Sequence, residues 1–239
     1  MFHVPCFMKL TWAGQSCFQI SVSNGKDHSA DIVIDPFDEK IGLKLPNFSA
    51  DILLVTHNHS DHNNIKVVKD NPFLIENPGE YEIKGVFVQG IPSFHDDKEG
   101  KERGKNTIYI IEAEDMRFCH LGDFGQKQLT DEQLESIGKV DVLMIPVGGT
   151  FTIDSSEASK VIGQIEPKIV IPMHYQLSRS QGDRGSSISS GPKLKIELDG
   201  VEKFLKVMGK NSIVPQEKLV VKTSTLPKEG AMEIVVLSV

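Results

Sequence analysis

The sequence predicts an α/β protein, and two features of its pattern support this prediction. Short apolar runs recur along the chain between Gly, Pro, Asn and Asp residues, as is typical of strands. Segments with helical periodicity and helix-start residues follow several of these runs. With 239 residues, of which 39% are hydrophobic and 25% charged, the chain is long enough to bury a full core, and we expect one domain over residues 1–239.

The predicted strands are most frequent in the first half of the chain. The run Ile52–Val55 is apolar at every position, which is typical of an interior strand covered on both faces. In chain order, the predicted strands are Leu10–Trp12, Cys17–Val22, Asp31–Ile34, Ile52–Val55, Val86–Ile91, Thr107–Glu112, Met116–His120, Val142–Ile145, Lys168–Ile171, Lys218–Val221 and Glu233–Leu237.

Helical patterns follow some of these strands. Thr130 and Gln133 have capping-box spacing, in which each side chain bonds the backbone of the other residue. One low-complexity segment, SRSQGDRGSSISSGP at residues 178–192, cannot build a packed core, so we expect a mobile loop there. The predicted helices are Ile65–Lys69, Thr130–Ser136, Ser155–Ile165 and Gly200–Met208.

Composition and charge exclude several classes of protein. The net charge of −7 disfavours a nucleic-acid partner, because phosphate binding needs clustered Lys and Arg. No apolar run nears the ~20 residues that span a bilayer, and the N-terminus lacks the pattern of a secretory signal. Cys6, Cys17 and Cys119 form neither a C-x-x-C pair nor an even set, which indicates reduced thiols. We therefore expect a cytoplasmic protein that acts on a small molecule and binds no membrane.

The stretch DILLVTHNHSDHNN, residues 51–64, places three histidines and an aspartate directly after an apolar strand. His57 and His59 are two residues apart, so in extended backbone both imidazoles can face one ion. Asp61 and His62 follow and can face a second ion beside the first. Imidazole and carboxylate are ligands that zinc prefers besides thiolate, so this stretch predicts a metal site at the carboxyl end of a strand.

Further ligand-type residues follow other apolar runs. His95 follows GVFVQGIPSF, Asp123 ends MRFCHLGDFG, and His174 ends PKIVIPMHY. Each therefore arrives after a strand, which is the placement needed for ligands to converge on one sheet edge. Asp35 ends DIVIDPF and can orient a ligand histidine through a hydrogen bond.

These motifs make the chain resemble the metallo-β-lactamase-fold hydrolases. Within that superfamily, LTWAGQSCFQI, VIDPF, HLGDFG and VIPMHY look most like the branch grouped with L-ascorbate-6-phosphate lactonase. The signature His-x-His-x-Asp-His is complete, and the downstream ligand motifs follow in the family's order, so the matching residues are His57, His59, Asp61, His62, His95, Asp123 and His174.

The resemblance implies a four-layer αββα sandwich with two divalent metal ions at one edge. Zinc is the expected metal, and Mn²⁺, Fe²⁺ or Ni²⁺ would also suit such ligands. Two ions roughly 3.5–4 Å apart share a hydroxide, which would attack a small ester, lactone or phosphoester. By family pattern the first ion lies between His57, His59 and His95, the second between Asp61, His62 and His174, and Asp123 bridges them, so Asp61 and Asp123 also serve catalysis.

Three local features have two interpretations each. His120 is a possible leaving-group acid, unless the strand that contains it turns the side chain into the core. Residues 98–106, KEGKERGKN, form either a solvated charged loop or an anion-gathering flap near the metals. Residues 147–152, VGGTFT, form either a plain turn or a turn that offers backbone N–H groups to an anion.

Two other functions compete with a small-molecule hydrolase. A nuclease or phosphodiesterase on nucleic acid is disfavoured by the charge and by Phe124, where related RNA-processing enzymes carry Thr in a GDT motif. An iron redox protein is disfavoured by His59, where di-iron members typically carry Glu.

The resemblance also implies that the first strand opens at Met8, so residues 1–7 are expected to be an upstream extension with translation beginning at Met8. His3 and His28 are expected to be exposed, and the oligomeric state stays open.

Overall fold

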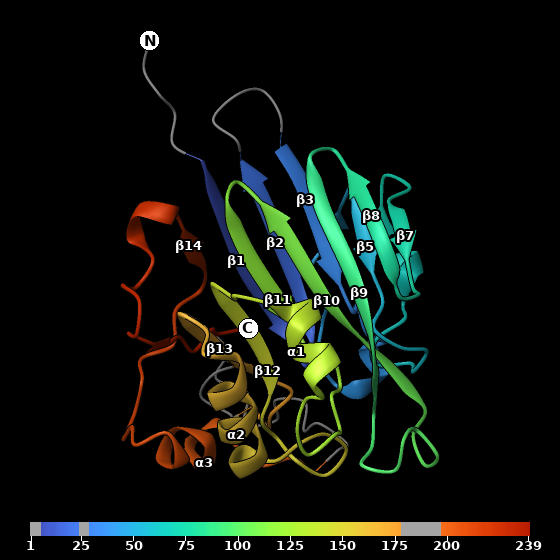
Figure 1. Cartoon of the computed structure of the whole chain (residues 1–239). Coiled ribbons are helices and arrows are strands. Elements are labelled where there is room, and N and C mark those ends of the chain that lie inside the picture. Colours follow the sequence, from blue (N-terminus) through green and yellow to red (C-terminus); the bar gives the residue numbers. More distant parts are fainter. Residues whose placement is uncertain (1–5, 24–28, 178–196) are drawn as a thin grey trace, which may run out of the picture.

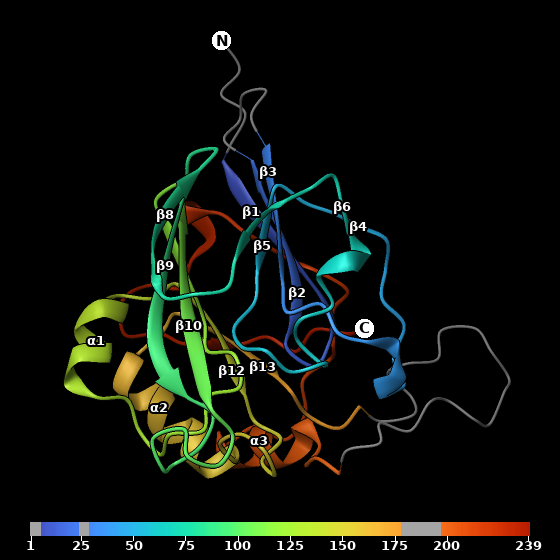
Figure 2. The same cartoon turned by 90° about the vertical axis from the view of Figure 1, so that its right-hand side faces the viewer.

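Two β-sheets pack face to face in the computed structural model, which describes residues 6–23, 29–177 and 197–239 (Figure 1). Figure 2 shows the sheets from the side, with helices outside the second sheet. The predicted loop 178–192, as well as His3 and His28, lies outside the described residues.

The first sheet has six strands in the order β14-β1-β2-β3-β5-β7. β1, β2 and β3 form an antiparallel meander, whereas β3, β5 and β7 run parallel. Because parallel strands end at the same edge, the residues after β3 and β5 lie close together. The strands are β14 (Leu219–Val221), β1 (Phe7–Gly14), β2 (Cys17–Ser23), β3 (Ser29–Ile34), β5 (Ile52–Leu54) and β7 (Phe73–Ile75).

The second sheet has seven strands in the order β15-β13-β12-β11-β10-β9-β8. The pairs β8–β9, β9–β10 and β10–β11 are antiparallel, and β11, β12, β13 and β15 run parallel. β9 and β11 share a direction, since both are antiparallel to β10. The strands are β15 (Glu233–Ile234), β13 (Ile169–Met173), β12 (Val142–Pro146), β11 (Met116–His120), β10 (Lys105–Ala113), β9 (Val86–Phe94) and β8 (Gly79–Ile83).

The main core lies between the two sheets. Leu10 and Ile20 from the first sheet share one buried cluster with Ile108 and Ile110 from the second. β12 is buried at every position, because helices cover its outer face as well. These helices are α1 (Asp131–Ile137), α2 (Ser155–Ile165) and α3 (Val201–Val207).

Short segments cover the outer face of the first sheet. Phe37 and Phe48 belong to a second buried cluster there, beneath the two-stranded sheet of β4 (Phe48–Ser49) and β6 (Val68–Lys69). The helix predicted at Ile65–Lys69 is wrong: a 3-10 turn, η2 (Ile65–Val67), leads directly into β6. Asn64 gives this turn no side-chain cap, and the β-branched residues that follow favour extended backbone. The 3-10 turns are η1 (Glu39–Ile41), η2 and η3 (Thr223–Thr225).

The remaining predicted elements match the structure closely. Every predicted strand overlaps an observed one, α2 has the predicted bounds, and the capping box of Thr130 and Gln133 at α1 is present. β1 begins at Phe7, which pairs with Ser23, so the segment expected to be an extension already joins the sheet at its last residue. The three cysteines are free thiols. In the described ranges, no helix is long and apolar enough to cross a membrane.

Candidate metal centre

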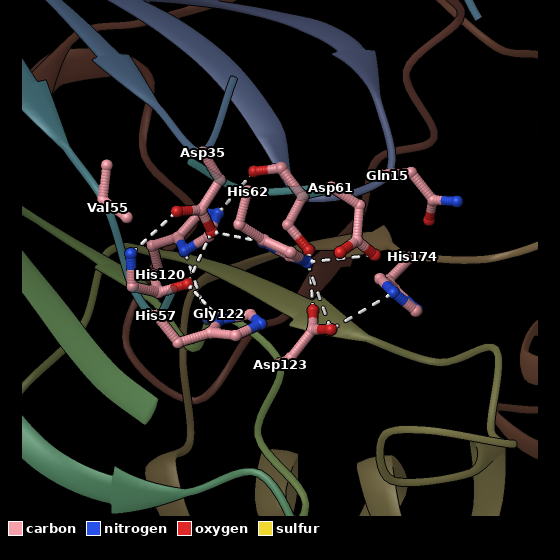
Figure 3. Close-up of polar contacts among 12 residues, drawn as sticks. Gln15, Asp35, Val55, His57, Asp61, His62, His120, Gly122, Asp123 and His174 are labelled. Carbon is pink, nitrogen blue, oxygen red and sulfur yellow. Dashed lines mark hydrogen bonds and ion pairs between the residues drawn. The ribbon is translucent and has the colours of Figure 1, made fainter. Parts of the chain in front are cut away.

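All seven predicted ligand residues meet at one edge of the sandwich, where strands of both sheets end. Figure 3 shows His57, Asp61, His62, Asp123 and His174 at this edge. The first sheet contributes the segment 57–62, which follows β5, and the second contributes the residues after β9, β11 and β13. Two groups of potential ligands form there, and in each group one ligand-type atom per residue lies within 4.8 Å of the others. The histidine group is His57, His59 and His95, and the carboxylate group is Asp61, His62, Asp123 and His174.

Asp123 lies between the two groups. Its Oδ2 atom is 3.2 Å from His62 Nε2, 3.3 Å from His95 Nε2 and 3.3 Å from His174 Nε2. Burial would raise the pKa of Asp123, but His174 and His62 hold it well below its usual range. The side chain is therefore a carboxylate that contacts imidazoles of both groups.

Asp35 anchors the stretch that follows β5. It accepts hydrogen bonds from the Thr56 backbone N–H (2.8 Å) and hydroxyl (2.7 Å), and its Oδ2 lies 3.0 Å from His62 Nδ1. The Thr56 hydroxyl has one hydrogen, which it donates to Asp35, so its 3.0 Å contact with His57 Nδ1 makes this nitrogen the donor. Asp35 thus orients both imidazoles and directs each Nε2 into the site.

The ring nitrogens are suited to a cation. His57 Nε2 is buried and has no hydrogen-bond partner among the described residues, which costs about 1–3 kcal/mol. Burial lowers the pKa of His57, His59 and His174, so these rings present lone pairs at neutral pH. Burial would also lower the pKa of His62, but Asp123 and Asp35 raise it. A divalent cation would supply the missing partner of His57 Nε2, so the donor set fits a metal ion.

His120 does not have the position needed for a leaving-group acid. The strand continues through it, and its fully buried ring packs edge-on against Phe18 at 5.7 Å between ring centroids. Its Nδ1 accepts the Gly122 N–H at 3.1 Å, and its Nε2 lies 2.9 Å from the Ser16 carbonyl oxygen. Both ring nitrogens contact backbone groups, so the position of His120 does not support the leaving-group acid considered for it.

Two supporting residues escaped the sequence predictions. Ser16, in the turn between β1 and β2, donates its hydroxyl to Asp123 Oδ1 at 3.1 Å. Asn106 accepts the Asp123 N–H at 3.0 Å, and its amide nitrogen donates to the Leu121 carbonyl (2.8 Å) and the Ser93 hydroxyl (2.7 Å). These contacts fix the loop that carries Asp123. The only sequence signal for Ser16 is its place in WAGQSCF, and Asn106 has none.

Two glycines allow the backbone to approach the ligands closely. A Cβ atom at Gly125 would collide with the carbonyl group of His95, and one at Gly148 would collide with the carbonyl oxygen of His174. In the turn at residues 147–152, Gly148 is explained by this close packing, and Gly149 takes part in a hydrogen bond within the turn. The Gly149 N–H bonds the Ile153 carbonyl at 3.3 Å, so the plain-turn interpretation holds for that amide.

A cavity of about 250 Å³ opens on the candidate ligand residues. A hollow of about 350 Å³ exists at the β10–β11 turn, but its lining, residues 112–117, contains no histidine. The smaller cavity therefore marks the functional site. Its lining residues are His59, Asp61, His95, Arg103, Asp123, Phe151 and His174.

Comparison with known proteins defines the class. Residues 9–174 match the family described as the beta-lactamase superfamily domain, and the observed sheets have the metallo-β-lactamase fold. The chain is similar to a UPF0173 metal-dependent hydrolase of Pyrococcus horikoshii, with 30% identity over 230 residues that cover 80% of this chain and 100% of that protein. The corresponding Thermococcus kodakarensis protein is 28% identical over 232 residues, again covering 80% and 100%.

A solved structure agrees with this placement. A metallo-beta-lactamase superfamily protein of Thermotoga maritima, which its name describes as a Zn-dependent hydrolase, is 34% identical and superposes with a TM-score of 0.70. The superposition covers 97% of this chain and 100% of that one. The chain belongs to the UPF0173 metal-dependent hydrolase family, and it is a metal-dependent hydrolase of the metallo-β-lactamase superfamily.

Proposed function

We propose that the protein is a dinuclear metal-dependent hydrolase that cleaves a small ester, lactone or phosphoester. The observation that carries this proposal is the position of Asp123, whose Oδ2 lies 3.3 Å from His95 in one group and 3.2 Å from His62 in the other. A carboxylate between two sets of neutral or hydrogen-bonded imidazoles is suited to bridge two cations.

The proposed ligand assignment follows the two groups. When bound, two divalent ions, with zinc expected and Mn²⁺, Fe²⁺ or Ni²⁺ acceptable to the same ligands, supply a water of lowered pKa and polarise the scissile carbonyl or phosphoryl group. The first ion would be held by His57, His59 and His95, the second by Asp61, His62 and His174, and both by Asp123.

The chain's own residues keep these ligands in place and move protons. Asp35 and Thr56 fix the tautomers of His57 and His62 through their Nδ1 atoms. Hydrolysis consumes one water, whose oxygen goes to the acyl or phosphoryl group while a proton goes to the leaving oxygen. Asp61 lines the cavity with 20% of its side chain exposed, which supports a role for its carboxylate in moving that proton.

The substrate is open within this chemistry. The likeness to L-ascorbate-6-phosphate lactonases makes lactones the first substrates to try, and we place the reaction in the cytoplasm. The net charge of −7 continues to disfavour nucleic acid. His59, which lies in the histidine group, occupies the position at which the resemblance implies Glu for di-iron redox members. This difference disfavours an iron redox function.

Metal analysis combined with a substrate panel tests the proposal. Purified protein should bind up to two divalent ions per chain and hydrolyse at least one member of a panel of lactones, thioesters and phosphodiesters. His59→Ala should lower occupancy of the first position, whereas Ser60→Ala, an exposed neighbour outside both groups, should leave both metal content and turnover unchanged. Full metal loading in His59→Ala, or turnover that survives complete metal removal, would contradict the assignment.

A further inference from the structure

Among the described residues, Arg103 is the one that lines the cavity and carries a permanent positive charge. It comes from the loop between β9 and β10, whereas the ligand-type residues His59, Asp61, His95, Asp123 and His174 form the rest of the polar lining. The guanidinium lies over the Phe151 ring, 4.5 Å from its centroid. A cation is therefore fixed on the cavity wall beside the candidate metal centre.

The Arg103 side chain has spare hydrogen-bond donors. A guanidinium carries five N–H groups, and in the described parts of the chain one of them is used, in a long 3.4 Å bond to the Thr150 carbonyl. Neighbouring lysines differ: Lys98 pairs with Glu102 at 2.6 Å and Lys101 with Glu99 at 3.4 Å. Within the described residues, Arg103 has no carboxylate partner.

The backbone beneath Arg103 is firmly held. Asp96, directly after His95, accepts backbone N–H groups of Lys98, Gly100, Glu102 and Arg103 at 2.7–3.0 Å. The loop is thus preorganised, and Arg103 does not depend on a ligand for its backbone position.

We propose that Arg103 binds a carboxylate or phosphate group of the substrate, while the bond to be hydrolysed lies at the metal centre. The planar guanidinium matches such oxyanions in a two-bond geometry, and Phe151 holds that plane against the cavity wall. At about 250 Å³ the cavity holds on the order of eight water volumes, so the substrate is small. The inference rests on the proposed hydrolase function and narrows it to small anionic esters, lactones or phosphoesters.

Kinetics on a matched pair of esters test the proposal in the metal-loaded full chain. Mono-4-nitrophenyl succinate carries a free carboxylate, and 4-nitrophenyl acetate has none. Arg103→Gln should lower the ratio of kcat/KM for the succinate ester to that for the acetate ester about tenfold or more, mainly through KM. Arg103→Lys keeps the positive charge without the planar guanidinium, so its kcat/KM ratio should lie between those of the wild type and Arg103→Gln. Lys101→Gln removes the same charge from the same loop but outside the cavity, and should leave the ratio unchanged.

A binding measurement separates this inference from the hydrolase proposal. Succinate and inorganic phosphate should raise the thermal midpoint of the wild type and Lys101→Gln more than that of Arg103→Gln, and the larger shift tells which oxyanion is preferred. Equal shifts in all three, or an unchanged kcat/KM ratio in Arg103→Gln, would overturn the role of Arg103 while leaving the hydrolase intact. If Arg103→Gln lowered kcat/KM equally for both esters and also lowered the thermal midpoint, Arg103 would have a structural role only. Hydrolysis of neither ester by the wild type would count against the hydrolase, and the midpoint shifts would still decide the role of Arg103.

Discussion

The histidine group and the carboxylate group lie side by side but are held very differently. In the histidine group, His59 is exposed, and His57 is oriented through one hydroxyl, that of Thr56. In the carboxylate group, His62 and Asp123 are at most 2% exposed; His62 donates directly to buried Asp35, and Asp123 accepts the hydroxyl of buried Ser16. The groups therefore differ in their most exposed member: His59 is exposed, whereas Asp61 has 20% of its side chain exposed, and both His57 and His95 are buried.

Charge sharpens this difference. The carboxylate group contains its own counter-charges, because Asp123 contacts three imidazoles and Asp35 contacts His62. The histidine group has no carboxylate of its own apart from its contact with Asp123 through His95. We therefore expect the carboxylate group to keep its shape with or without a cation, and the histidine group to depend on one.

The largest expected effect comes from the residue that joins the groups. Asp123→Asn keeps a carbonyl ligand but loses the charge, so kcat/KM should fall on the order of 10²-fold or more, about 2.7 kcal/mol, while the fold and at least one metal ion remain. Steady-state kinetics and metal analysis on the same preparation measure both. Near wild-type turnover by this variant, on a substrate that His59→Ala cannot process, would indicate a one-metal mechanism.

A smaller loss is expected on removal of the charge that orients His62. In Asp35→Asn the amide nitrogen cannot accept the bonds that Thr56 and His62 donate, so metal affinity of the carboxylate group should fall about 10- to 100-fold. Competition with a chromogenic chelator measures this affinity. Asp31→Asn is the control, because Asp31 lies in β3, the strand that leads to Asp35, and accepts the Ser21 hydroxyl outside the site. Equal losses in both variants would show that strand stability, not ligand orientation, is responsible.

Metal removal should distinguish the two groups by rate. With EDTA, the ion whose ligands include the exposed His59 should leave first, about tenfold faster than the ion at the carboxylate group. Stopped-flow or manual time courses of metal release would then show two phases. His59→Ala should remove the fast phase. A single phase in the wild type would mean that the exposure of His59 does not govern exchange.

The smallest predicted effect concerns the hydroxyl on Asp123. Ser16→Ala removes one hydrogen bond to a buried carboxylate that keeps its other contacts, so kcat should fall about three- to tenfold, on the order of 1 kcal/mol. Ser155→Ala is a matched control, since Ser155 is equally buried but donates to the Val147 carbonyl. Loss of thermal stability without loss of kcat in Ser16→Ala would make the contact purely structural.

The sequence predicted the convergence of the candidate ligands better than it predicted the residues that support them, for a physical reason. His95, Asp123 and His174 each follow an apolar strand, so strand order alone brings them to one edge. Ser16 and Asn106 are common residue types whose partner lies 107 and 17 positions away, and only the tertiary packing pairs them with Asp123.

Errors in the predicted elements have equally local causes. β8 (Gly79–Ile83) carries two glutamates on an edge strand and lacks the apolar run that marks an interior strand. The segment Ile65–Lys69 has helical spacing, but pairing of Val68 with Phe48 draws it into a sheet. His120 was ambiguous in the sequence, because the side to which a strand-end residue points depends on where the strand stops.

The close packing of Gly125 and Gly148 against the backbone of His95 and His174 sets limits on protein engineering. Neither glycine lines the cavity, so a substrate-guided mutant library would treat both as neutral positions. Even alanine there would push on a carbonyl group and displace the imidazole attached to the same residue. In a saturation mutagenesis screen these two positions should tolerate fewer replacements than Arg103 or Phe151 does, although only the latter two face the reactants. Libraries that aim to change substrate preference should therefore vary the wall at residues 103 and 151 and leave both glycines fixed.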